Sequence, residues 1–369
     1  MDQAQPHPSL KTRHKEYSLI LTMFTIPVLL YLQHSTSLLI TVLINLLALV
    51  TILGSAFSVV RHADVLAHRL GEPFGSLILS LAVVILEVSL ISALMVTGDT
   101  GPTLMRDTLY SVIMIVMGGL VGISLLLGGR KFATQHVNLA GIKQYLTALL
   151  PLAIIILVLP ATLAGSTFTS GQLIVIALLS AAMYLVFLTI QTRTHQNLFI
   201  YEHEDEGDGP DGHHGKPSIH SNAWHAVWLV IHLISVIAIT KINAGSLEYL
   251  LTELHAPPQF TGFLIALLIL SPEGLGALRA VMANQVQRAM NLFFGSVLAT
   301  ISLTVPAVVV ISLITGKSLV FGLSTPNIVL LVSILLLCQS SFATGRTNVL
   351  NGAAHLAIFV AYLLVLMMG

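Results

Sequence analysis

The sequence predicts an all-α polytopic membrane protein with about eleven transmembrane helices. Charged residues make up only 9% of the 369-residue chain and hydrophobic residues 55%, with a mean hydropathy of +0.91. A soluble domain carries roughly a quarter charged residues. The apolar runs continue for about 18 to 25 residues, the length that a helix needs to cross roughly 30 Å of hydrocarbon. A transmembrane β-barrel would instead show short segments of alternating hydropathy, which this sequence lacks.

The first apolar stretch follows the basic residues Lys11, Arg13 and Lys15 and resembles a signal sequence. No small-x-small cleavage site follows it, so we predict an uncleaved first span. In chain order, the predicted spans lie near residues 17–32, 37–60, 75–96, 106–127, 145–164, 171–191, 223–240, 260–283, 289–314, 326–342 and 347–368.

The distribution of basic residues predicts the orientation. With the N-terminus in the cytoplasm, thirteen Lys and Arg residues fall in cytoplasmic segments, and only Arg106, Lys241 and Lys317 fall on the opposite side. This positive-inside bias predicts a cytoplasmic N-terminus and a periplasmic C-terminus, in a bacterial inner membrane.

Two glutamates interrupt the apolar runs at matching places. Glu87 and Glu273 each lie in the middle of a predicted span, and the interval between them equals that between the starts of the second and seventh spans, near 37 and 223. Because five helices reverse the direction in which a second copy enters the membrane, we predict two inverted five-helix repeats with a binding site where they meet. The predicted domains are 1–36 (tail and peripheral first helix), 37–195 (first repeat), 196–222 (cytoplasmic linker) and 223–369 (second repeat).

The two glutamates supply the chemistry that a cation/proton exchanger needs. An ionisable side chain near the bilayer centre costs at least a few kcal/mol and usually serves binding or proton traffic. A carboxyl group in low dielectric can hold a proton at neutral pH, and an incoming cation favours its ionised form. Proton and cation binding then exclude each other. The alternative is a pair of neutral, hydrogen-bonded glutamates that hold helices together.

Several neighbouring residues could assist the two glutamates. Pro272 precedes Glu273 and glycines follow it, so we predict a helix broken at the site whose freed carbonyls bind a cation, with a plain proline kink as the alternative. Hard cations take oxygen ligands. The selected supporting ligands are Ser80, Ser271, Asn291, Ser296 and Thr300, from a wider set that includes Ser76, Ser89 and Ser302. Each of these is, taken alone, more often a helix-packing or hydrogen-bonding residue.

Other polar or small residues have simpler interpretations. His355 in the last span is either a proton relay or, the favoured interpretation, a hydrogen-bonded packing residue. Gly118, Gly119 and Gly122 are expected to permit close helix contact. Cys338 is the only cysteine, which excludes an intrachain disulfide or a cysteine metal cluster.

The linker between the halves is acidic and rich in glycine and histidine. A segment of this composition cannot bury a core, so we predict a flexible cytoplasmic tether. An alternative is a sensor of calcium, pH or a transition metal, because histidine titrates near neutrality. The candidate regulatory residues are Glu202, Glu204, Asp205, Glu206, His213 and His214.

Several motifs resemble those of a known family. The first is Ala-His-Arg-Leu-Gly at 67–71, followed by the Glu87 helix, and the second is Ser-Pro-Glu at 271–273 with Asn-Leu-Phe-Phe-Gly-Ser at 291–296. A third is Gly-Arg-Thr-Asn-Val-Leu-Asn-Gly at 345–352. The first two are similar to the two α-repeats of the calcium/proton exchanger branch of the calcium/cation antiporter superfamily. Nearly the whole chain resembles this branch, and within it the bacterial sodium-potassium/proton and calcium/proton antiporters of enterobacterial type.

The sequence also departs from the family pattern. Val83 and Val84 replace its Gly-Asn, a glycine follows Glu273, and Asn351 replaces an acidic residue. We infer a weaker calcium preference and a share of sodium or potassium transport.

The sequence therefore predicts a secondary antiporter that exports sodium, potassium or calcium in exchange for protons by alternating access around Glu87 and Glu273. A dedicated calcium/proton exchanger is the alternative within transport. A channel would need no exchangeable proton, and an intramembrane enzyme lacks support because no paired metal-ligand or serine–histidine motif is found. The expected partners are the cations, protons and the lipid bilayer, with no cofactor and, at zero net charge, no nucleic acid. The sequence leaves a homo-oligomer open.

Overall fold

The computed structural model describes residues 16–32, 35, 37–70, 74–97, 101–163, 167–199 and 220–368. Eleven apolar helical segments follow one another in this part of the chain. Their helices are α1 (Tyr17–Leu32), α2 (Leu38–Leu70), α3 (Phe74–Thr97), α4 (Leu104–Ile113), α5 (Val121–Phe132), α6 (Leu139–Ala153), α7 (Ser170–Thr189), α8 (Asn222–Glu253), α9 (Gln259–Met282), α10 (Val286–Ala299), α11 (Val305–Thr315), α12 (Thr325–Ser341) and α13 (Val349–Met368).

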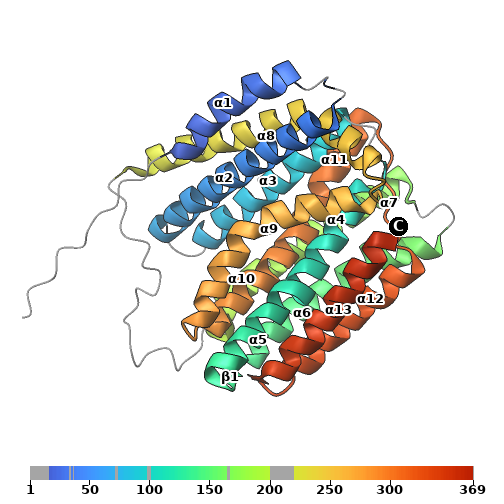
Figure 1. The fold of residues 1–369 in the computed structure, drawn as a ribbon. Helices are drawn as coiled ribbons and strands as arrows, with labels where there is room; N and C mark the ends of the chain where they lie inside the picture. Colours follow the sequence, from blue (N-terminus) through green and yellow to red (C-terminus); the bar gives the residue numbers. More distant parts are fainter. Residues whose placement is uncertain are drawn as a thin grey trace, which may run out of the picture.

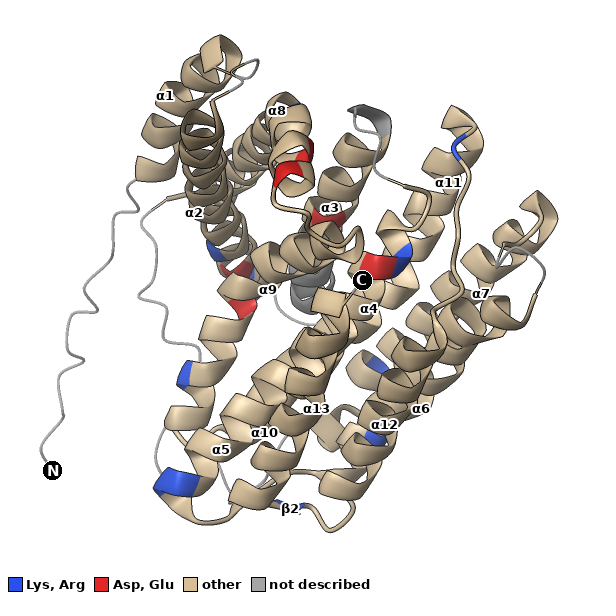
Figure 2. Ribbon diagram, turned by 45° about the vertical axis from the view of Figure 1, so that its right-hand side comes forward, with Lys and Arg blue, Asp and Glu red and all other residues tan. Residues whose placement is uncertain are grey.

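The fold confirms the all-α membrane architecture predicted from sequence. Eight of the helical segments are long and apolar enough to cross a bilayer, and the apolar helices at 17–32, 81–95 and 325–341 are shorter. Lys, Arg, Asp and Glu are sparse along the bundle, and most of the ribbon carries other residues (Figure 2). The helices lie roughly side by side, with α1, α2, α3 and α8 together on one flank (Figure 1).

Helix α1 is held to the bundle by hydroxyl pairs as well as apolar contacts. Thr25 Oγ1 lies 2.8 Å from Thr51 Oγ1 of α2, and Ser18 Oγ lies 2.9 Å from Ser58 Oγ. Such interhelical hydrogen bonds help helices to associate in a membrane, because lipid is as apolar as leucine and apolar side chains gain little by leaving it. Helix α1 also has an exposed face, on which Met23 and Tyr31 are 77% and 87% exposed.

Close helix crossings occur where glycine is present, as predicted for Gly118, Gly119 and Gly122. A Cβ atom added to Gly118 would lie 3.1 Å from Phe359 Cβ, and one added to Gly122 would lie 3.0 Å from the backbone nitrogen of Leu356. Gly352 of α13 approaches the backbone of α5 in the same way. These glycines let α13 pack directly against the segment from α4 to α5.

Four π-helical turns widen the helices in the described part of the chain, and none of them was predicted from sequence. They are Met114–Leu120 between α4 and α5, Ile154–Val158 after α6, Ile190–Thr194 after α7, and Thr300–Thr304 between α10 and α11. A π-helical turn changes the hydrogen-bonding register and often marks a functional site. His355 uses one of these turns: its Nδ1 lies 2.6 Å from the Met117 carbonyl oxygen and its Nε2 lies 3.0 Å from Ser341 Oγ. Both ring nitrogens are thus engaged in packing contacts.

The prediction of a helix broken at Pro272 is wrong. Helix α9 is continuous from Gln259 to Met282, with Pro272 inside it. Proline removes a single backbone donor, and in a membrane bundle neighbouring groups compensate for this loss. The Ser271 hydroxyl donates to the Leu267 carbonyl oxygen at 2.5 Å, which adds a bond in the turn before the proline. The carbonyls around Glu273 therefore stay within a helix.

The connections between helices gather at the two ends of the bundle. At one end, the short strands β1 (Gln135–His136) and β2 (Arg346–Thr347) pair antiparallel, and Asn138 N–H donates to Gln287 Oε1. At the other end, Val320 N–H donates to the Pro102 carbonyl oxygen. At each end, the connections that contact one another are those that the sequence predicts on the same side of the membrane.

Candidate functional site

Glu87 of α3 is the most deeply buried carboxyl group in the centre of the bundle. It is 0% exposed. Thr300 Oγ1 and Thr304 Oγ1 donate hydrogen bonds to its Oε2 at 2.9 Å and 3.0 Å. Its Oε1 is also buried and has no hydrogen-bond partner within the described part of the chain. Hydrogen bonds therefore hold Oε2 in place, whereas Oε1 is available to bind a cation.

The π-helical turn Thr300–Thr304 explains why two threonines reach one oxygen. This turn packs against α3, and Thr300 and Thr304 are separated by about one helical turn, so they lie on the same side of the segment. Thr300 was among the supporting ligands selected from sequence, whereas Thr304 was missed. A second threonine one turn after Thr300 was the signal that would have identified it.

Glu273 lies on α9, which packs against both α3 and α10. The charges of Glu87 and Glu273 are close enough to interact. The Ser296 hydroxyl of α10 faces Glu273, without a hydrogen bond of regular geometry. Glu273 Oε2 is buried and, like Glu87 Oε1, has no hydrogen-bond partner among the residues the structure describes. Two carboxyl groups from different helices thus each present one uncommitted oxygen.

The remaining supporting candidates make no hydrogen bond to either glutamate within the described chain. Ser271 bonds its own helix, as described above. Asn291 donates to the Phe199 carbonyl oxygen at 2.7 Å and accepts from Gln287 Nε2 at 2.9 Å, so its side chain holds the end of the segment after α7. Its amide is engaged in these contacts and not with Glu273. The side chain of Ser80 and the linker residues Glu202, Glu204, Asp205, Glu206, His213 and His214 lie outside what the structure describes.

A cavity of about 60 Å³ lies between α2, α3, α8 and α9, and neither glutamate lines it. Leu90 and Leu94, one and two turns after Glu87, line its α3 side. Its polar lining comes from Asn45, Thr240, Asn243 and Thr261. Asn243 Nδ2 donates to Asn45 Oδ1 at 2.8 Å, which joins α2 to α8 at this level. The cavity lies toward the end of the bundle where α3 finishes and α9 begins.

The donor set of the site consists of oxygen atoms. It comprises the carboxylates of Glu87 and Glu273 and the hydroxyls of Ser296, Thr300 and Thr304. Sodium, potassium and calcium are hard cations that take oxygen ligands. A buried carboxylate also binds a proton when no cation is present. The arrangement fits a site at which a hard cation and protons alternate.

Fold, buried carboxylates and oxygen donors together define a membrane cation exchanger. The chain belongs to the family described as sodium/calcium exchanger protein, which it matches over residues 40–193 and 224–368.

Named relatives and solved structures agree with this family. The chain is 70% identical to the sodium-potassium/proton antiporter ChaA of Escherichia coli K12, over 96% of this chain and 97% of that protein. It is 37% identical to the putative ionic transporter y4hA of Sinorhizobium fredii, over 84% and 85%. The fold is similar to native YfkE (TM-score 0.73, 20% identity, 95% and 100% covered) and to the H+/Ca2+ exchanger CAX (0.66, 15%, 94% and 87%).

Proposed function

We propose that this protein is a secondary antiporter that moves sodium, potassium or calcium in exchange for protons. The observation that carries the proposal is the pair Glu87 and Glu273, each with a buried carboxylate oxygen lacking a hydrogen-bond partner in the described chain. The 70% identity to a sodium-potassium/proton antiporter supports monovalent cations as substrates. Calcium stays in the proposal because the same oxygen donors suit it.

In this mechanism the two carboxyl groups alternate between protons and cation. When both are ionised and no cation is bound, their charges repel each other. A bound cation or bound protons remove this repulsion, so the empty, doubly charged state is unfavourable. Thr300 and Thr304 keep the Glu87 carboxyl group in place during the exchange. Obligatory coupling follows, because the site changes sides only when it is neutralised.

The repeats provide the framework for alternating access. The interval in sequence from Glu87 to Glu273 recurs between the π-helical turns that begin at Met114 and Thr300. It recurs again between the starts of α6 and α12, at Leu139 and Thr325. In such a repeat α2 corresponds to α8 and α3 to α9. The contact of α3 with α8 then corresponds to that of α2 with α9, and both are present. These correspondences support two inverted repeats, 37–195 and 223–369. The bias of basic residues toward one side supports a cytoplasmic N-terminus and a periplasmic C-terminus in a bacterial inner membrane.

The decisive experiment measures cation-driven proton movement. Purified protein in liposomes with an imposed pH gradient should dissipate that gradient when sodium, potassium or calcium is added, and the three cations should be compared. A channel would conduct cations without moving protons. A response to calcium alone would instead identify a dedicated calcium/proton exchanger.

Replacing each glutamate tests its place in the mechanism. We expect Glu87→Gln and Glu273→Gln each to reduce exchange to the level of empty liposomes, because an amide keeps the size of the side chain but does not bind and release a proton. Glu253→Gln, at the exposed end of α8, is the matched control and should exchange normally. Near wild-type exchange in either site variant would remove that residue from the mechanism.

A further inference from the structure

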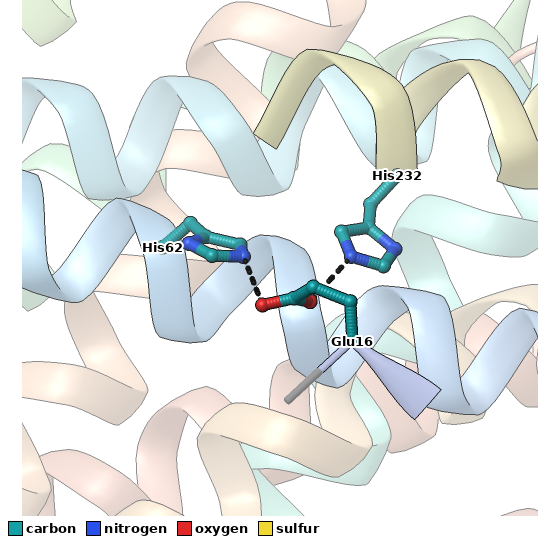
Figure 3. Close-up of side chains that lie close together, drawn as sticks. All are labelled: Glu16, His62 and His232. Atoms are coloured by element: carbon teal, nitrogen blue, oxygen red, sulfur yellow. Dashed lines mark hydrogen bonds and ion pairs between the residues drawn. The ribbon is translucent and has the colours of Figure 1, made fainter. Parts of the chain in front are cut away.

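Three buried histidines and one carboxylate meet at one end of the bundle, apart from the two transport glutamates. His62 of α2 and His225 and His232 of α8 are each 0% exposed. Glu16, immediately before α1, lies between His62 and His232 (Figure 3). The sequence analysis did not identify this group, although His225 and His232 are separated by about two helical turns and therefore lie on one face of a helix.

The geometry of Glu16, His62 and His232 suits a metal ion. Glu16 Oε2 lies 2.9 Å from His232 Nε2, and Glu16 Oε1 lies 3.5 Å from His62 Nε2. One ligand atom from each of these side chains lies within 4.8 Å of the other two. Figure 3 shows both imidazole rings directing a nitrogen toward the carboxylate. Ligands that bind zinc at about 2.0 to 2.2 Å are separated from one another by similar distances.

A contact behind the ligands orients His62. Its Nδ1 lies 2.8 Å from His225 Nδ1, so one of these nitrogens donates to the other. When His62 Nδ1 is the donor, the Nε2 lone pair faces Glu16. Metal-binding histidines commonly use their second ring nitrogen in this way, which fixes the tautomer and the ring orientation.

One Glu16 carboxylate oxygen is hydrogen-bonded to Arg61 and His232, whereas the other is not hydrogen-bonded within the described chain. Arg61 Nη2 lies 2.7 Å from Glu16 Oε2. Glu16 Oε1 is buried and has no hydrogen bond from any residue that the structure describes. Glu16 Oε1 therefore keeps a lone pair for a cation, although Arg61 Nη2 also lies 3.5 Å from His62 Nε2.

We propose that Glu16, His62 and His232 bind a divalent transition-metal ion such as Zn²⁺. Two imidazoles and one carboxylate favour this class, because imidazole suits zinc, copper, nickel and iron, whereas the alkali and alkaline-earth ions prefer oxygen. The site differs from the transport site in both residues and donor atoms. Its three ligands come from α2, α8 and the start of α1, so a bound ion ties the peripheral helix to the bundle.

Tryptophan fluorescence can report metal binding without any transport assay. The chain has two tryptophans, and both lie at this site: Trp224 packs against His62 with ring centroids 5.3 Å apart, and Trp228 against His232 at 6.3 Å. Adding Co²⁺ to the purified full-length protein should quench their fluorescence and produce a visible absorption band, with one ion bound per chain. Excess Zn²⁺ should reverse both signals.

Substitution of each proposed ligand tests whether the ion binds at this site. His62→Gln, His232→Gln and Glu16→Gln should each weaken Co²⁺ binding by at least about tenfold, since even outer contacts of a metal site contribute that much. His355→Gln, a buried histidine elsewhere, is the matched control. A Gly/Ser replacement of residues 202–214 removes His203, His213 and His214 of the linker and should leave the signal intact. Because Glu16 lies immediately before a peripheral helix and not in the core, Glu16→Gln tests the site even if a variant of a buried histidine fails to fold.

The outcomes separate this site from transport. The Glu87→Gln, Glu273→Gln double variant should still bind Co²⁺, so loss of exchange and loss of metal binding are independent results. The proposal is overturned if the wild type shows no saturable Co²⁺ signal, or if the signal survives in all three ligand variants. It is also overturned if the linker replacement abolishes the signal.

Discussion

At the scale of single residues, the two glutamates of the proposed transport site are held by different numbers of hydrogen bonds. Glu87 accepts two threonine hydrogen bonds, whereas Glu273 accepts none of regular geometry in the described chain. When the chain is shifted by the interval that brings Glu273 onto Glu87, Thr300 and Thr304 fall on Met114 and Gly118, so the first half offers no equivalent hydroxyls. The two carboxyl groups therefore differ in how firmly they are held.

The threonine contacts can be tested by removing only their hydroxyls. A hydrogen bond to a charged group contributes about 1.5–3 kcal/mol, so Thr300→Val and Thr304→Val should each raise the half-saturating cation concentration about tenfold or more. Thr108→Val is the control, because Thr108 Oγ1 bonds only the Leu104 carbonyl oxygen of its own helix. Cation titration of proton flux in liposomes measures the effect. Equal behaviour of all three variants would exclude a role of these hydroxyls in cation binding.

At the scale of helices, the close packing of α13 on α5 holds the second half of the chain against the first. A Cβ atom at Gly352 would lie 2.8 Å from the Gly122 carbonyl oxygen and 2.9 Å from Leu126 Cα, both part of the backbone of α5. Backbone atoms do not move aside as a flexible side chain does. His355, one turn further along α13, adds bonds to Met117 and Ser341 at the same crossing.

The crossing predicts opposite effects for two glycine substitutions. Gly352→Ala should lower the thermal unfolding midpoint in detergent, because overpacking costs about 1–3 kcal/mol. Gly245→Ala in α8, where no atom lies within 4 Å of the added Cβ, should leave the midpoint unchanged or raise it, since alanine is the better helix former. A Gly352→Ala midpoint equal to that of Gly245→Ala would contradict the close approach.

At the scale of the whole molecule, competition between protons and cations sets the pH dependence. Protons occupy the carboxyl groups at low pH and exclude the cation, so apparent cation affinity should rise with pH. If one proton leaves for each cation bound, the half-saturating concentration should fall about tenfold per pH unit while the site is protonated. The midpoint belongs to the coupled pair and not to either glutamate. A constant affinity from about pH 6.5 to 9 would contradict direct competition.

The acidic linker provides a second test on the whole molecule. Replacing residues 202–214 with a Gly/Ser segment of equal length should leave maximal exchange intact, because such a segment serves as a solvated tether. At most, the pH or cation concentration at which exchange begins should shift. Loss of exchange in protein that still inserts normally would place this linker in the transport path.

The sequence alone determined the helical membrane architecture, and it singled out Glu87 and Glu273 as the candidate site residues. Continuous apolar runs require helices, because unpaired backbone groups are too costly in lipid. Carboxylates are so unfavourable there that Glu87 and Glu273 stood out without any coordinates. Thr300 followed from the oxygen chemistry of hard cations, and the glycine contacts followed from the need for close helix packing.

Only the tertiary structure decided what depends on neighbours from distant parts of the chain. The π-helical turn at Thr300–Thr304 aims two hydroxyls at Glu87, and no local pattern announces such a turn. Pro272 stays within a continuous helix because the surrounding bundle compensates for its missing donor. The group of Glu16, His62 and His232 draws on three segments spread over more than half of the chain. Periodicity reports which face of a helix is buried, whereas packing alone decides which side chains meet there.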